Sequence, residues 1–85
     1  MYRLEKGKRE IMLRFSRESA CGAADREEIC RMLLRREVDI EKIADSGSGI
    51  LFHNRLGAVV LEAEQFPSFL FTVRSVVPKS AWFYE

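Results

Sequence analysis

The chain has 85 residues, of which 47% are hydrophobic and 32% are charged, and its formal net charge is +1 at pH 7. This length predicts a single domain over residues 1–85, and the composition is typical of a globular protein rather than of a disordered chain. Because the charge is nearly balanced, it argues against an overall field that would steer the protein toward nucleic acid.

The sequence contains little that would direct the protein to a membrane or bind a metal. It has no apolar run of about 18 residues and no apolar segment near its start, so we expect a cytoplasmic protein without a membrane partner. Cys21, Cys30 and the single histidine, His53, are too few for a zinc site, and two cysteines do not make a disulfide framework. We therefore predict two reduced thiols and no metal or cofactor.

The N-terminal segment has the alternation of a strand. Ile11, Leu13 and Phe15 are apolar at every second position, which predicts a half-buried strand. Tyr2 and Leu4 predict a shorter partner strand across a turn at Gly7.

A helix is expected to follow. Acidic residues cluster near Asp25, where the dipole of a beginning helix favours negative charge, and apolar residues then recur at helical spacing. The glycines of residues 46–49 end the helix. We expect one long helix, with the alternative that it breaks at Val38-Asp39 and that Asp39 caps a second short helix.

The remaining residues are rich in β-forming side chains. Residues 49–64 predict a hairpin around a turn at 55–57, residues 69–77 predict a strand, and residues 81–84 predict a last strand. In the alternative, Pro67 lies in the first turn of a helix instead of before a strand.

These elements predict an α+β fold. One long helix, broken or not, packs on a four- to five-stranded antiparallel sheet in the order (β)β-α-β-β-β-β. The order resembles, in topology only, that of cystatin-like domains. The helical alternative for the segment after Pro67 gives a ferredoxin-like β-α-β-β-α-β order instead.

No catalytic site is predicted. His53 lies in an apolar strand with no nucleophile in a suitable context, so we interpret it as a hydrogen-bonded sheet residue rather than a general base. Gly47 and Gly49 follow a helix instead of preceding one, which does not suit a phosphate site. Glu62 and Glu64 share one strand face, but paired carboxylates are common on exposed strands and do not indicate a catalytic pair. We therefore expect a non-enzymatic protein.

The second face of the sheet gives the functional prediction. A single helix covers one sheet face, yet the alternation leaves apolar residues with a charged rim on the other, which is typical of an interaction surface. The predicted partner-binding residues are Arg14, Val60, Leu70, Arg74, Val76, Trp82 and Tyr84. We therefore expect an adaptor or inhibitor, of the size that phages and mobile elements encode, which binds another protein or forms a homodimer.

The alternative is a module that binds RNA or single-stranded nucleic acid. Its aromatic residues would stack on bases, and its basic N-terminal segment would contact phosphates. The residues that would serve it are Lys6, Lys8, Arg9, Arg14 and Arg17.

Overall fold

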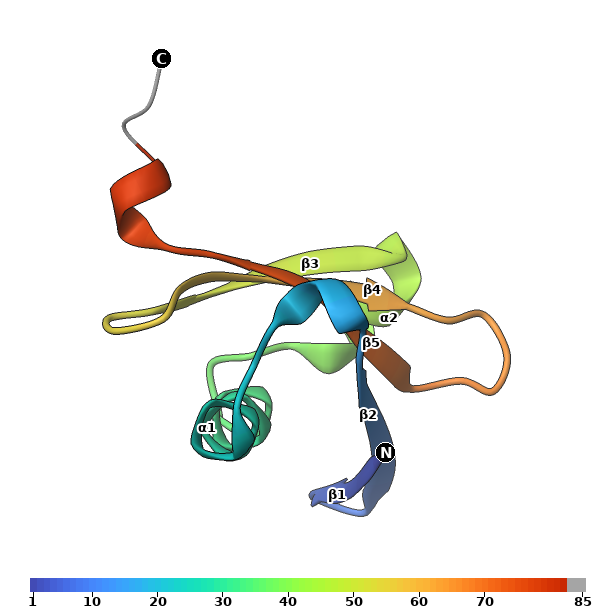
Figure 1. Ribbon diagram of the computed structural model, residues 1–85. Helices are drawn as coiled ribbons and strands as arrows, with labels where there is room; N and C mark the ends of the chain where they lie inside the picture. The colour runs from blue at the N-terminus through green and yellow to red at the C-terminus, as the bar shows by residue number, and fades with distance from the viewer. Residues whose placement is uncertain (83–85) are drawn as a thin grey trace.

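The computed structural model describes residues 1–82 and shows a small α+β fold with one five-stranded sheet (Figure 1). Its strands and helices are β1 (Tyr2–Lys6), β2 (Arg9–Phe15), α1 (Ala23–Leu33), α2 (Ile40–Ser46), β3 (Ser48–His53), β4 (Gly57–Ala63) and β5 (Leu70–Val77). Two short 3-10 helices, η1 (Arg17–Ser19) and η2 (Lys79–Ala81), follow β2 and β5. Among the described residues, no helix is long and apolar enough to cross a membrane.

The sheet is mixed, so the prediction of a wholly antiparallel sheet is wrong. The strand order is β1-β2-β5-β4-β3, and β5 pairs in parallel with β2, whereas all other neighbours are antiparallel. The parallel pair results from the position of the last strand in the sheet. The hairpins fix the relative directions of β1 and β2 and of β3 and β4, but β5 inserts between β2 and β4 and runs in the same direction as β2.

The prediction of a single long helix is wrong, because residues 34–39 interrupt the helical region, and this interruption includes the predicted break at Val38-Asp39. Helix α1 ends at Leu33 and α2 begins at Ile40. The Asp39 carboxylate accepts hydrogen bonds from the backbone N–H groups of Glu41 and Lys42, both at 3.1 Å, so it caps α2 as predicted. Gly47, with a φ of 83°, ends α2 in the left-handed conformation.

A lysine from the first strand stabilises the broken end of α1. The Lys6 Nζ group donates to the backbone carbonyls of Leu33, Arg35 and Val38. These carbonyls belong to the end of α1 and the segment that follows it, where helical partners are lacking. Partial burial lowers the pKa of Lys6, although the nearby Asp39 carboxylate opposes this effect.

The C-terminal third confirms one prediction and corrects another. Residues 70–77 form a strand, which excludes the ferredoxin-like alternative. Ala81, the expected first residue of the last strand, instead ends the 3-10 helix η2, and the backbone N–H of Trp82 donates to the carbonyl of Lys79. Pro78, which lacks an N–H group and cannot continue a ladder, directly precedes this turn. Residues 83 and 84 of the expected strand lie outside the described residues.

The core lies between α1, α2 and one face of the sheet, which we call the helix face. Ile29, Met32 and Leu33 of α1 are almost fully buried. The strand residues that belong to the same cluster are Ile11, Leu13, Leu51, Val59, Leu61, Phe71 and Val73. Figure 1 shows the β1–β2 hairpin bending toward α1, whereas η2 lies on the other side of the sheet. We call the sheet face on that side the open face.

Candidate functional site

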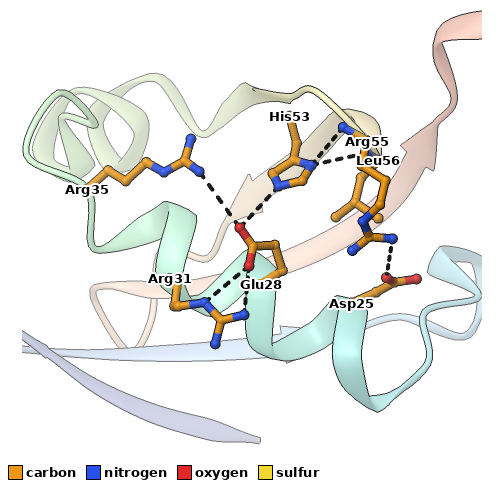
Figure 2. A network of polar contacts seen from close by, with 7 residues as sticks. All are labelled: Asp25, Glu28, Arg31, Arg35, His53, Arg55 and Leu56. Carbon is orange, nitrogen blue, oxygen red and sulfur yellow. Dashed lines mark hydrogen bonds and ion pairs between the residues drawn. The ribbon is translucent and has the colours of Figure 1, made fainter.

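A polar network attaches the end of β3 to α1 (Figure 2). The His53 ring accepts hydrogen bonds at Nδ1 from the backbone N–H groups of Arg55 and Leu56, both at 3.1 Å. Its Nε2 lies 3.1 Å from Oε1 of Glu28 on α1. Because Nδ1 accepts two hydrogen bonds, the proton of the neutral ring must be on Nε2, which donates to the carboxylate.

Glu28 holds the network together because it also binds arginines of its own helix region. Its Oε2 accepts from Arg31 at 2.7 Å, and its Oε1 lies 3.7 Å from Arg35. The hydrogen bonds from Arg31 and His53 lower the pKa of Glu28, so it is ionised near neutral pH. The pKa of Arg31 is raised in turn by the Glu28 carboxylate.

A second ion pair strengthens the same attachment. The guanidinium of Arg55, in the turn between β3 and β4, lies 3.0 Å from the Asp25 carboxylate near the start of α1. The turn is thus attached to α1 at two points. Through it, the end of β3 is held in one orientation relative to the helix.

This arrangement suits a structural role of His53 better than a catalytic one. Both ring nitrogens already have hydrogen-bond partners, and only 13% of the side chain is exposed. A general base needs a free ring nitrogen that can reach a substrate proton. The interpretation of His53 as a hydrogen-bonded sheet residue is confirmed.

Within residues 1–82, no three His, Cys, Asp or Glu side chains come together as they would around a metal ion.

The orientation of His53 sets that of its neighbours in β3. Side chains alternate along a strand, so His53 on the helix face places Phe52 and Ile50 on the open face. The cross-strand register agrees, because Phe52 lies opposite Ala58 and Ile50 lies opposite Val60. Phe52 is 65% exposed and Ile50 is 54% exposed.

The end of the chain adds an aromatic residue to this region. The Trp82 ring packs edge-on against Phe52, with ring centroids 5.6 Å apart, and its indole N–H donates to the Val77 carbonyl at 3.1 Å. Trp82 is itself 39% exposed. We refer to Ile50, Phe52, Val60, Val77 and Trp82 together as the apolar patch.

Charged side chains lie beside the apolar patch on the same face. Arg74 pairs with Glu62 at 3.1 Å, and Arg14 pairs with Glu64 at 3.1 Å and donates to the Thr72 hydroxyl. These exposed pairs add little stability. They form a polar border of balanced charge next to an apolar centre, which is the usual anatomy of a protein interface.

The structure brings together some of the predicted partner-binding residues and separates others. Val60 and Trp82 lie in the apolar patch, and Arg14 and Arg74 lie on its border. Leu70 is on the open face, opposite Met12, but it is only 5% exposed and offers little surface. Tyr84 lies outside the described residues.

Val76 lies on the helix face, so its predicted place in the partner surface is wrong. Val60 pairs with Ser75 and Leu61 pairs with Val73, which leaves Arg74 as an extra residue in β5. This β-bulge reverses the alternation beyond Arg74 and places Val76 opposite Val59, packed against the core.

Sequence analysis did not select Ile50 and Phe52, the most exposed members of the apolar patch. Residues 50–52 are apolar at every position, so alternation alone does not say which side faces the helices. The contact that decides the orientation of β3 is between His53 and Glu28, which are distant in the sequence. The Glu28 carboxylate on α1 holds His53 on the helix face, and Phe52 therefore points away.

The basic residues of the nucleic-acid alternative lie in two places: Lys6, Lys8 and Arg9 line one surface pocket with Glu41 at the β1–β2 turn, whereas Arg14 and Arg17 lie away from it. Lys6 is directed toward the end of α1, whereas Arg9 lies with its guanidinium 4.0 Å from the Phe69 ring centroid and 3.4 Å from the Glu41 carboxylate. Arg14 is on the open face with Glu64. Lys8 is in the β1–β2 turn, and Arg17 is in η1 beyond the opposite end of β2.

The candidate site is therefore the apolar patch, with its charged border and the polar network that orients β3. No family model, no curated protein and no solved structure matches this chain.

Proposed function

We propose that this protein is a non-enzymatic interaction module, an adaptor or inhibitor, that binds another protein through the apolar patch. The observation that carries the proposal is the clustering of exposed large side chains. Three of the six exposed large apolar residues among residues 1–82 are Ile50, Phe52 and Trp82, and they share one face. Aromatic residues are enriched at protein interfaces and often carry much of the binding energy.

The free energy that a partner would gain by covering Phe52 supports the same proposal. A phenylalanine buries roughly 150–250 Å² when it is covered, at about 25 cal/mol per Å². Because Phe52 is 65% exposed, a partner that covers it would gain about 2–4 kcal/mol from this side chain. This is enough for about a 30- to 700-fold change in affinity.

The test is partner capture with matched variants. Immobilised protein is used to capture proteins from a cell extract, and each captured protein is purified and titrated against three forms of the chain. Phe52→Ser removes the centre of the apolar patch. Phe66→Ser removes an equally large side chain that is 83% exposed but lies in the β4–β5 loop. The proposal predicts that Phe52→Ser weakens binding at least tenfold and that Phe66→Ser leaves it unchanged.

Two results would contradict the proposal. Equal binding by wild type and Phe52→Ser would place the interface elsewhere. Binding to a labelled single-stranded RNA that weakens steeply as salt is added would instead favour the nucleic-acid alternative, because phosphate contacts release counterions.

The proposed location is the cytoplasm. Cys21 and Cys30 are both free thiols, which suits a reducing compartment. Burial raises the pKa of the Cys30 thiol, so this cysteine acts as a small core residue rather than as a nucleophile.

A further inference from the structure

The two edges of the sheet are built differently. At one edge, β1 carries Arg3, Glu5 and Lys6, and charged side chains on an edge strand discourage pairing with another chain. At the other edge, β3 has the sequence Ser-Gly-Ile-Leu-Phe-His, with no Lys, Arg, Asp, Glu or Pro. In the part of the chain that the structure describes, no further strand lies beside β3. The β3 edge therefore lacks the charged and proline residues that usually prevent an edge strand from pairing with another chain.

The hydrogen-bond pattern shows which backbone groups of β3 face outward. The Ala63 N–H donates to the carbonyl of Gly47, the residue before β3, at 2.9 Å, and these residues continue the register in which Ser48 lies opposite Glu62. They therefore occupy a bonded position of the β3–β4 ladder. Bonded and non-bonded pairs alternate in an antiparallel ladder. The N–H and C=O groups of Ser48, Ile50 and Phe52 therefore point away from β4, toward the free edge.

We propose that β3 pairs antiparallel with β3 of a second copy of this chain, which goes beyond the proposed binding of another protein. Two-fold pairing centred on Leu51 places Ile50 opposite Phe52 of the second copy, and Phe52 opposite Ile50. These are the residues whose backbone groups face outward, so the two pairs form four hydrogen bonds. The result is a continuous sheet across both copies.

The composition of β3 suits pairing with a second copy of itself. Identical strands that pair about a two-fold axis bring like charges close together, and β3 has none to repel. Opposite residues in antiparallel strands point to the same face, so the two apolar patches join into one surface. The pairs of Ile50 with Phe52 are of the aromatic–β-branched kind that stabilises neighbouring strands.

The test is the mass of the protein in solution, measured by sedimentation equilibrium over a range of concentrations. Wild type is expected to reach twice the monomer mass. Ile50→Pro removes the outward N–H without removing a bond to β4, and Gly49 before it has no Cβ to clash with the proline ring. Ile50→Pro is expected to stay at monomer mass, whereas the matched control Ile50→Thr keeps the N–H and is expected to dimerise.

A second measurement keeps the proposal testable if Ile50→Pro does not fold. In wild type, the amides of Ile50 and Phe52 should exchange with solvent slowly at high concentration and faster on dilution. The amide of Leu51, bonded to β4, should remain protected at both concentrations. A wild type that stays monomeric, a dimer that survives Ile50→Pro, or rapid exchange at Ile50 in the dimer would each overturn the proposal. None of these results changes the expected effect of Phe52→Ser on a captured partner at the monomer's apolar patch.

Discussion

Two substitutions at His53 separate the roles of its ring nitrogens. Asparagine places its side-chain oxygen near the position of Nδ1, and glutamine places its amide near Nε2. His53→Asn therefore keeps an acceptor for the N–H groups of Arg55 and Leu56, whereas His53→Gln keeps only the donor to Glu28. We expect His53→Gln to be the less stable variant. Glu28 still has Arg31 at 2.7 Å in His53→Asn, but the N–H of the buried Leu56 loses its acceptor in His53→Gln.

The expected loss in His53→Gln follows from that one buried group. A buried N–H left without a partner costs about 1–2 kcal/mol, which lowers the melting temperature by about 4–16 °C in a domain of this size. Circular dichroism during thermal unfolding measures the difference, and hydrogen exchange at the Leu56 amide should be faster only in the glutamine variant. If His53→Asn melts below His53→Gln, or if Leu56 exchange is the same in both, the assignment of the acceptor role to Nδ1 is wrong.

Three other substitutions test the elements that support the site. Glu28→Gln should lower the stability of the protein near neutral pH. Because the pKa of Glu28 is lowered in the folded state, its stabilising effect is lost on protonation, so the stability difference from wild type should shrink as the pH falls below the ordinary carboxyl pKa of 4.5. Melting curves across that pH range measure this difference. Lys6→Met should cost about 1–2 kcal/mol in urea unfolding, since the carbonyls at the end of α1 lose a charged donor, whereas Lys6→Arg should retain part of it. Asp39→Ala should cost about 1 kcal/mol by the same assay, and Asp39→Ser should recover most of the loss; equal stability of all three would refute the capping role.

The features that the sequence predicted well are those decided by local chemistry. The strand alternation around Ile11, the glycine turn at Gly7 and the cap at Asp39 depend on residues close together in the chain. The strand over residues 70–77 follows from β-branched and aromatic side chains in the same way. Each of these features follows from residues that are neighbours in the chain.

The features that the sequence did not predict depend on contacts between distant segments. The parallel pairing of β2 with β5 joins residues such as Leu13 and Phe71, which are far apart in the chain. The bulge at Arg74 appears in the register between β4 and β5, which are separate strands that the alternation within β5 alone does not describe. One extra residue there moves Val76 to the opposite face, so counting by alternation failed from that point onward.

The end of β3 has an arrangement that the proposed partner binding would explain. Here a polar side chain, His53, points inward to a carboxylate, while the adjacent Phe52 points outward and is 65% exposed. A strand selected for monomer stability alone would favour the reverse, since burying phenylalanine stabilises the fold and exposed histidine needs no internal partner. The polar network around Glu28 holds His53 on the helix face, so Phe52 lies on the open face. Its contacts leave Phe52 exposed on the open face, where the proposed partner would cover it.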